Sequence, residues 1–583
     1  MGVYWSLLIM GKDYLNKKKT KSFIFFAQTP PQKMSIKTVF TNIVWTTLAL
    51  AVISAFIFGA YVARFSLVKS SFISIGLYGC ILAAHYTLQI LFALLARRQT
   101  NKALSNRWND WVGVSCGLLI VGYREDGDLF RQCLLSARKQ EYDNKAGIIV
   151  VVDGNSAEKL GAAGDMYMGE IFNQVFLDKN PCCIVVPFIL SERLDVLDEQ
   201  VIELYSVVSA ALNDGRPVCI LQPHHGKRAA MYTGFQMFMY HDVEAIIVTD
   251  SDTKLDPMAT KELAATLVDN NVGAACGEVL IWNKDSSLIA FLSSLRYYSA
   301  FNIERACQSF FGCVGCVSGP LGIYRKSCLK EILPDWLHQK SLGSPCTYGD
   351  DRHLTNLVLS LSKRVKYTHL AKCLTETPDN YFRWLTQQTR WSKSFFREQF
   401  ITISFFYKQS PWMTYEMIFN LIYPFVVLFS MTYVLFHQST LNMMVMFTIV
   451  FLAGFVRAIV MSIISGSTLF LFYPMYGYIY IFGLLAAKFQ ALIFLWDTTW
   501  GTSPRGTSSI SFRFHQTIFP ILWILIVLGG ITFNVADNYV VKKSHWGHYE
   551  TIAASVLGCI LVGWMIVYSI FRCATVNVPK VPK

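Results

Sequence analysis

The sequence predicts a membrane protein in which an α/β domain is inserted between membrane-spanning helices. Of its 583 residues, 53% are hydrophobic, and the formal net charge is +13. The apolar residues gather at both ends of the chain, whereas residues 107–378 have the composition of an ordinary globular domain. In that middle part, short β-rich runs alternate with helix-length segments, which is typical of a mainly parallel sheet. This composition disfavours a soluble multidomain protein and favours a membrane protein with basic cytosolic faces.

Six apolar runs are long enough to cross a bilayer, which takes about 20 residues for roughly 30 Å of hydrocarbon. They are Val39–Ala63, Ser71–Ala96, Met413–Phe436, Leu441–Ile464, Thr517–Val535 and Thr551–Phe571. Neither N-terminal run resembles a cleaved signal, because the second follows the first almost at once. Ser467–Leu495 is also apolar, but counting it would leave an odd number of crossings and place Arg572 and Lys580 outside. We therefore expect an interfacial or re-entrant segment there.

Lys and Arg residues beside the predicted spans indicate the orientation, because such residues stay on the cytosolic side. The first span is preceded by Lys17, Lys18, Lys19, Lys21 and Lys37, and the second is followed by Arg97 and Arg98. The inserted domain is therefore predicted to be cytosolic. The expected division is a cytosolic tail over 1–38, two spans over 39–98, a cytosolic domain over 99–380, interfacial helices over 381–412, a channel region over 413–573 and a cytosolic tail over 574–583.

Polar groups follow the ends of four predicted strands. The strands are expected over Cys116–Val121, Gly147–Asp153, Pro217–Leu221, Ala245–Asp250 and Val272–Gly277. The first four run into the sequences GYRED, DGNS, HHGKR and DSDT. Because ligands of parallel sheets bind beyond the carboxyl ends of the strands, these four groups predict one site.

The sequence DSDT places Asp250 and Asp252 where a buried strand opens into a loop. On a continuing strand the two carboxylates would share one face and repel each other. Paired hard oxygens in a loop suit Mg²⁺ or Mn²⁺, whose usual partners are substrate phosphates. Lys227 and Arg228 are predicted to supply cations for the same phosphates. Together these residues indicate a nucleotide-diphosphate site, although a short acidic pair alone is more often a solvated loop.

A second acidic cluster, Asp350 and Asp351, stands in the sequence YGDDRHLTN. Either carboxylate could act as a general base once a diphosphate is held nearby. The alternative is a helix N-terminus, where acidic side chains stabilise the helix dipole. Both interpretations can hold together, because a base at the start of a helix is well positioned.

The fifteen cysteines are scattered over spans and the predicted cytosolic domain, where thiols stay reduced. One C-x-x-C, Cys313 to Cys316, has no second pair. A structural zinc site is therefore disfavoured, and small residues lining a tight site are the favoured interpretation.

The segment Tyr381–Phe400 has the composition of a basic amphipathic helix at a membrane surface. For Lys393 and Arg397 we expect membrane anchoring. Arg390 and Trp391 combine a charge suited to phosphate with an aromatic face suited to a sugar ring.

Two ionisable residues fall inside predicted spans. Arg457 is predicted either to line a pathway or to snorkel to an interface, and the two are equally favoured. His85 is expected to be a packing residue.

The ordered set of motifs in this chain resembles the hyaluronan synthase family of processive membrane glycosyltransferases. These motifs are GYRED, VVDGN, GKR, DSD, SGPLG, GDDRHLTN, QQTRW and WGTS. The segment Ser294–Phe311 is also more similar to that family than to chitin or cellulose synthases. The resemblance implies a GT-A-like glycosyltransferase domain, with Mg²⁺ or Mn²⁺ as cofactor. It implies UDP-N-acetylglucosamine, UDP-glucuronic acid and a nascent polysaccharide as partners, no nucleic acid, and a multi-pass location in the plasma membrane.

The resemblance also implies roles for single residues. The uridine would be held by Tyr123, Glu125 and Asp153, and the ribose side by Asp250. The diphosphate would be bound by Lys227 and the metal by Asp252, while Asp351, beside Asp350, would be the base. The acceptor side would be formed by Gln387, Arg390 and Trp391, which would close over the diphosphate and stack on the acceptor, and a gating loop by Trp500, Thr502 and Ser503. This chain departs from the family at His225-Gly226 and Gly277-Glu278. Both departures are expected near the substrate, so sugar recognition stays open.

Two alternatives remain. A chitin synthase-like N-acetylglucosaminyltransferase would share most of these motifs. An anionic product would favour basic residues such as Arg457 and Arg296 near its route, but a cytosolic membrane face is basic as well. The second alternative is a transporter or channel with a nucleotide-binding domain. It accounts for the spans, but not for the GDDR and QQTRW sequences.

Overall fold

The structure is a computed structural model that describes residues 40, 47, 71–107, 113–154, 166–192, 199–497 and 514–576. The predicted gating residues Trp500, Thr502 and Ser503 lie outside this part of the chain. So does the predicted span Val39–Ala63, apart from Phe40 and Thr47.

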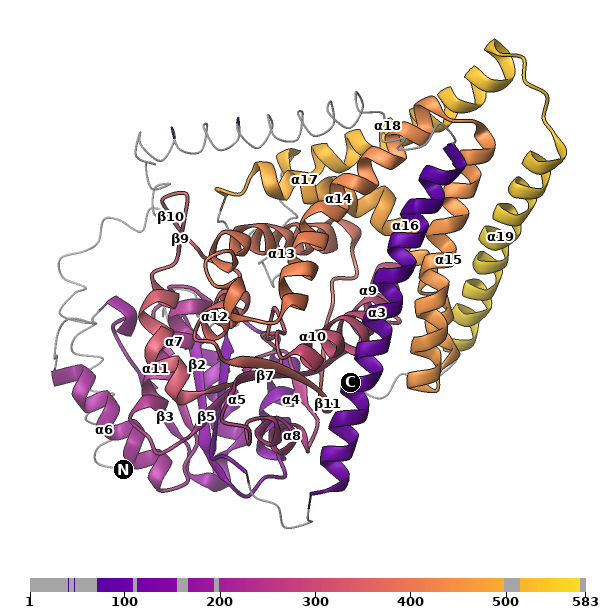
Figure 1. The fold of residues 1–583 in the computed structure, drawn as a ribbon. Helices are drawn as coiled ribbons and strands as arrows, with labels where there is room; N and C mark the ends of the chain where they lie inside the picture. Colours follow the sequence, from indigo (N-terminus) through magenta and orange to yellow (C-terminus); the bar gives the residue numbers. More distant parts are fainter. Residues whose placement is uncertain are drawn as a thin grey trace.

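A nine-stranded sheet forms the centre of the inserted domain, with strand order β3-β4-β2-β1-β5-β8-β7-β11-β6 (Figure 1). The strands are β1 (Cys116–Gly122), β2 (Lys145–Asp153), β3 (Cys182–Val185), β4 (Val218–Gln222), β5 (Ala245–Asp250), β6 (Lys254–Leu255), β7 (Val272–Ile281), β8 (Gly322–Arg325) and β11 (Arg364–Thr375). All five predicted strands are confirmed. The sheet is mixed, because β8 runs antiparallel to both β5 and β7.

The strands that carry the site are parallel neighbours. β1 lies between β2 and β5, and β4 pairs with β2. Their residues are rich in Ile and Val and almost entirely buried, as expected for parallel strands covered by helices on both faces. Gly117 permits one such close approach, because a Cβ there would lie 2.3 Å from the Phe238 ring of α7 (Lys227–Met239). The carboxyl ends of these strands therefore meet at one edge of the sheet.

Long apolar helices pack beside this domain (Figure 1). They are α3 (Ser71–Ser105), α14 (Pro411–His437), α15 (Thr440–Ser465), α18 (Phe514–Ala536) and α19 (His548–Val576). Within the described residues, four stretches are long and apolar enough to cross a membrane: Pro411–His437, Thr440–Ser465, Thr468–Ile493 and Ile518–Val541. The prediction of a membrane protein with an inserted α/β domain is confirmed.

The apolar segment expected to be interfacial or re-entrant is a chain of short helices. It comprises η6 (Thr468–Phe472), α16 (Pro474–Ile479), η7 (Tyr480–Leu484) and α17 (Leu485–Ile493). Its most apolar window is half buried within the protein, more than in the other three stretches. The segment is long enough to cross, so the total of six crossings stays a prediction.

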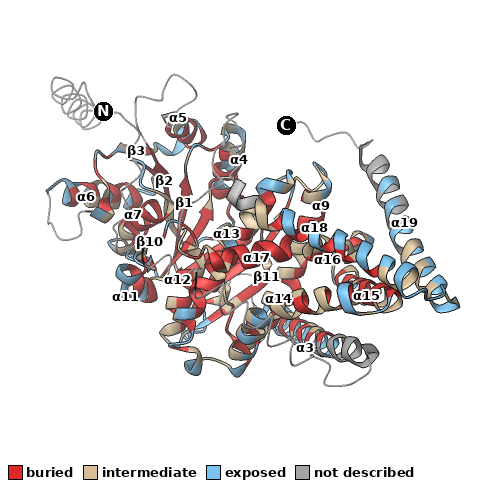
Figure 2. Ribbon diagram, turned by 90° about the horizontal axis from the view of Figure 1, so that it is seen from above, coloured by how far each residue is buried: buried red, intermediate tan, exposed pale blue. Residues whose placement is uncertain are grey.

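Helix α13 (Tyr381–Thr402) lies between the sheet domain and the apolar helices, where Figure 2 shows a largely buried region. It contacts α17 and α12 (Asp350–Ser360). The predicted membrane anchoring of Lys393 and Arg397 is wrong. The Nζ atom of Lys393 is 2.8 Å from Oδ2 of Asp497, and Arg397 donates to the carbonyl oxygen of Tyr348 at 2.7 Å. Both cations are buried and paired inside the protein because this face of α13 meets protein instead of lipid.

Candidate active site

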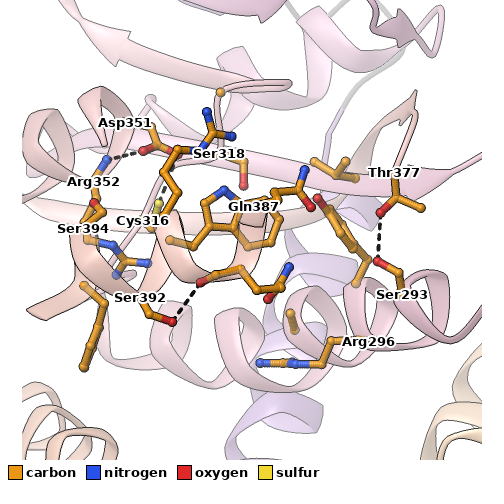
Figure 3. A pocket seen from close by; sticks show the side chains of 18 of the residues that line it. Ser293, Arg296, Cys316, Ser318, Asp351, Arg352, Thr377, Gln387, Ser392 and Ser394 are labelled. Atoms are coloured by element: carbon orange, nitrogen blue, oxygen red, sulfur yellow. Dashed lines mark hydrogen bonds between the residues drawn. The ribbon is translucent and has the colours of Figure 1, made fainter. Parts of the chain in front are cut away.

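One cavity of about 2530 Å³ connects the carboxyl edge of the sheet with the apolar helices. At the sheet edge it is lined by residues such as Asp153, Lys227 and Asp250, and farther on by Tyr423 of α14 and Val450 of α15. The residues to which the family resemblance assigned roles all line this cavity, as far as they lie in the described part of the chain. Figure 3 shows Gln387 in the pocket together with Asp351 and Arg296. The structure therefore brings the predicted site together and extends it between the helices.

Asp153, at the end of β2, organises the loop between β4 and α7. Its carboxylate accepts hydrogen bonds from the backbone N–H groups of His225 and Gly226 at 2.9 and 2.8 Å. Nδ1 of His224 lies 2.8 Å from the same carboxylate, and the His224 ring stacks on Tyr123 at 4.2 Å between centroids. The hydrogen bond to Asp153 raises the pKa of His224. Tyr123, predicted to hold the uridine, is thus fixed at the cavity wall.

Glu125 follows β1 and is buried beside the acidic loop. It accepts a hydrogen bond from the hydroxyl of Ser251 at 2.8 Å. Because Ser251 stands between Asp250 and Asp252, Glu125 fixes the backbone that presents both carboxylates. A direct contact of Glu125 with uridine stays a prediction.

Lys227 stands at the first position of α7 and points to the acidic residues. Its Nζ atom is 2.6 Å from Oδ1 of Asp250 and 3.9 Å from Oδ2 of Asp350. Burial disfavours the charge on Lys227, but Asp250, Asp350 and Asp351 outweigh it and raise the pKa. Gly319 lets this ammonium group approach closely, because a Cβ there would lie only 3.0 Å from it. Lys227 is therefore a fixed cation in the cavity.

Asp252 is the predicted metal ligand and lines the cavity two residues beyond β5. Burial and the neighbouring Asp250 carboxylate raise its pKa to about 7. Among the described residues, no group of three or more His, Cys, Asp or Glu side chains is arranged to hold a metal by itself. The donor set fits Mg²⁺ or Mn²⁺ bound by one or two carboxylates and completed by substrate phosphates and water.

Asp350 and Asp351 begin helix α12, which confirms the helix N-terminus interpretation. Oδ1 of Asp351 accepts from the backbone N–H of Arg352 at 2.7 Å, and its Oδ2 is 3.4 Å from Sγ of Cys316 (Figure 3). Burial and the adjacent Asp350 raise the pKa of Asp351. A buried carboxylate with a raised pKa is suited to accept a proton. Cys316 is a free thiol beside it, as expected for a small residue in a tight site.

The QQTRW sequence forms part of α13 and faces the cavity. Oε1 of Gln387 is buried and has no hydrogen-bond partner among the described residues. Burial lowers the pKa of the Arg390 guanidinium, while Asp350 and Asp351 oppose this effect. Trp391 is 38% exposed and lies edge-on to Tyr297 at 6.0 Å. This arrangement offers an amide, a cation and an aromatic ring to a ligand in the cavity.

Glu398 of α13 is a buried carboxylate that the sequence did not indicate. It accepts hydrogen bonds from Gln339 at 2.6 Å and from Asn356 at 3.0 Å, and its Oε2 lies 3.1 Å from Nδ1 of His353. Burial opposes its charge, but these partners and Arg397 hold its pKa at about 2. Because His353 and Asn356 belong to α12, Glu398 joins the helix of Asp351 to the helix of the QQTRW sequence.

We expect Glu398→Gln to lower both thermal stability and turnover. The amide nitrogen would replace one of the two carboxylate oxygens and face the donor of either Gln339 or Asn356. A buried donor would be left unpaired, at a cost of about 1–3 kcal/mol. A displaced α12 would misplace Asp351 and reduce the rate of UDP release by about 10-fold or more. Thermal unfolding and UDP release in detergent measure both effects. Glu331→Gln, on the exposed face of α11 (Lys326–Leu337), is the control and should leave both unchanged.

One predicted phosphate contact is wrong, and one residue expected near the substrate does not itself line the cavity. Arg228 was expected to bind phosphate, but it is buried, donates to the carbonyl oxygen of Trp336 at 2.7 Å and to Gln339 at 2.8 Å. Consecutive residues on a helix point in different directions, so Lys227 and Arg228 cannot share one ligand. Glu278 was expected near the substrate. It is buried on β7, where it accepts a hydrogen bond from Asn302, and it is not among the residues that line the cavity.

The two ionisable residues of the predicted spans both line the cavity. Arg457 is 5% exposed and points to the interior, so the snorkelling alternative is wrong. His85 stacks on Phe419 at 3.8 Å between centroids, and its Nδ1 is 3.0 Å from the Tyr415 hydroxyl. The prediction of a packing role for His85 is confirmed.

Comparison with known proteins identifies relatives over nearly the whole chain. Residues 227–505 match the family model of chitin synthases. Hyaluronan synthase 2 of Xenopus laevis is 38% identical, covering 92% of this chain and 95% of the relative. Hyaluronan synthase 2 of Homo sapiens is 39% identical, covering 86% and 88%. Among solved structures, a mannosyltransferase from Pyrobaculum calidifontis is 14% identical, with a TM-score of 0.39 over 72% of this chain and 99% of that chain.

These relatives confirm the predicted glycosyltransferase. The chitin synthase model matches only about half of the chain, residues 227–505. The transporter alternative is wrong, since the relatives, matched over 95% and 88% of their length, are named as synthases. The protein is a membrane enzyme that transfers sugars from UDP-sugars. With 38–39% identity over most of both sequences, the chain belongs to the hyaluronan synthase family.

Proposed function

We propose that the enzyme builds hyaluronan by adding N-acetylglucosamine and glucuronic acid in turn at one active site, and passes the polymer outward between its own helices. The observation that carries this proposal is the single cavity that joins Asp252, Lys227 and Asp351 to the interior of the helical region. A polymer that grows at the sheet edge can leave by that route without crossing lipid.

The chemistry follows from the placement of the side chains. Asp351 accepts the proton of the acceptor hydroxyl, whose oxygen attacks the anomeric carbon of the donor sugar from the side opposite to the leaving UDP. The glycosidic bond forms as the bond to UDP breaks, so the anomeric configuration inverts. Lys227 and Arg390 balance the charge that develops on the UDP diphosphate. A divalent ion held by Asp252 would supply further positive charge at the same phosphates.

The location proposed for this activity is the plasma membrane, with the sheet domain in the cytosol. UDP-sugars are anionic and are made inside the cell, so the donor site must face that side. The Lys and Arg residues that flank the predicted N-terminal spans support this orientation.

Product analysis tests the proposal against the chitin alternative. Purified protein given UDP-N-acetylglucosamine alone is expected to make no long polymer. Adding UDP-glucuronic acid should yield a high-mass product that hyaluronidase digests and chitinase does not. Long, chitinase-sensitive chains from the single donor would contradict the proposal.

A further inference from the structure

Three charged side chains form a compact group in the wall of the cavity, beyond the catalytic residues. Arg296 of α9 (Leu288–Ser299) donates two hydrogen bonds to Glu304 of η4 (Ala300–Arg305), at 2.9 and 3.0 Å. Arg457 of α15 donates to Oε1 of Glu304 at 3.1 Å, and this oxygen also accepts the 2.9 Å bond from Arg296. One carboxylate therefore serves two guanidinium groups, and the group carries a net charge of +1.

The two arginines differ in exposure, and each has a partner besides Glu304, which for Arg296 is the Tyr476 side chain. Arg457 also donates to Gln89 of α3 and stacks on the Tyr86 ring, with its guanidinium carbon 3.9 Å from the centroid. Its side chain is 7% exposed, whereas that of Arg296 is 33% exposed. Glu304 can thus remain with Arg457 when Arg296 turns to another anion.

The surroundings of this group are poor in negative charge. Lys488 of α17 lines the same cavity, and it forms no ion pair with a carboxylate in the described part of the chain. Among the described residues, the apolar helices contribute one acidic side chain to this lining, Glu416 of α14, which accepts a hydrogen bond from Gln89 at 3.1 Å. In this part of the cavity, away from the acidic residues of the sheet edge, an anion therefore meets more basic than acidic side chains.

We propose that Arg296, backed by Arg457, binds the carboxylates of the growing polysaccharide, and that Glu304 is an internal counter-anion that these carboxylates displace from Arg296. The inference rests on the proposed function, which gives the product one carboxylate in every second sugar. Two bare arginines in a partly desolvated cavity would hold such a polymer tightly. By competing for Arg296, Glu304 weakens each contact, so that the chain can advance by one disaccharide.

The charge of this group can be varied by substitution with neutral glutamine, which has nearly the same shape as Glu304 but is shorter than arginine. Glu304→Gln raises the net charge to +2, and Arg296→Gln lowers it to 0. The double variant Glu304→Gln with Arg457→Gln restores +1 and is the matched control. Binding of a fluorescent hyaluronan oligosaccharide to each purified protein is measured beside a neutral chitin oligosaccharide, with monodisperse elution and UDP binding as tests of folding.

The expected order of affinity for the hyaluronan oligosaccharide follows the charge. Relative to the unmodified protein, Glu304→Gln should bind about three- to tenfold more tightly, Arg296→Gln less tightly by a similar factor, and the double variant about equally. The differences should shrink at high salt, and the chitin oligosaccharide should not distinguish the four proteins. The inference is wrong if folded Glu304→Gln binds hyaluronan no more tightly, or if the neutral chain changes in parallel.

Should Glu304→Gln fail to fold, Arg296→Gln decides the question, and unaltered hyaluronan binding in that variant overturns the inference. Failure of the proposed function would be seen separately, in the product of the unmodified enzyme. If that product is hyaluronan and the variants do not follow the charge order, only the present inference fails.

Discussion

Asp351→Asn is expected to reduce sugar transfer by about 10²–10⁴-fold while UDP still binds. The asparagine amide keeps the size of the side chain but cannot accept the proton of the acceptor hydroxyl. The groups that hold the donor are fixed mainly by other contacts, because Lys227 pairs with Asp250 and Asp153 orders its own loop. UDP release measures transfer, and calorimetric titration with UDP measures binding.

The control for this variant is Asp335→Asn, on the exposed face of α11. A parallel loss of UDP affinity in Asp351→Asn would show that Asp351 has a structural role. The pH dependence gives a second check. Burial and Asp350 raise the pKa of Asp351, so its basic form is lost as the pH falls through a value above that of an ordinary aspartate. The rate should therefore decline on the acidic side in the unmodified enzyme. Asp351→Asn should remove the part of this decline that Asp351 causes, while the part caused by protonation of Asp252 should persist.

Asp252→Asn is expected to abolish metal-dependent transfer, with a loss of at least about a hundredfold. A neutral amide is a weak ligand for Mg²⁺ or Mn²⁺, so the charge on the leaving diphosphate would be poorly balanced. The fold should survive, because removing one carboxylate from the pair relieves repulsion with Asp250. UDP release is measured while Mg²⁺ and Mn²⁺ are titrated separately.

Asp242→Asn, in the exposed turn before β5, serves as the control for the metal experiment. Near-normal turnover in Asp252→Asn at ordinary metal concentrations would remove this residue from the metal site. Loss of activity in both variants would point to general damage near β5.

The order of the structural elements could be predicted from the sequence alone. Hydrophobic runs of about 20 residues predicted α14 and α15 to within two residues at each end, and an apolar run closed by Asp250 predicted β5 with its observed bounds. Because parallel strands expose their carboxyl ends at one edge, the same patterns predicted that Asp153, Lys227 and Asp250 would meet. Local pattern is sufficient here, since span length and strand burial are set by residues close together in the chain.

The partners of the charged side chains were decided only by the tertiary structure. Lys393 and Arg397 lie on a basic amphipathic helix, and periodicity cannot tell whether its polar face meets water, lipid headgroups or buried carboxylates. Glu398 gave no signal, because its four partners come from three separate segments. Arg296, Glu304 and Arg457 likewise meet across up to 161 residues of sequence. Such contacts depend on how helices pack against one another, and the free energy of burying a charge depends on exactly which groups the packing brings within hydrogen-bond distance.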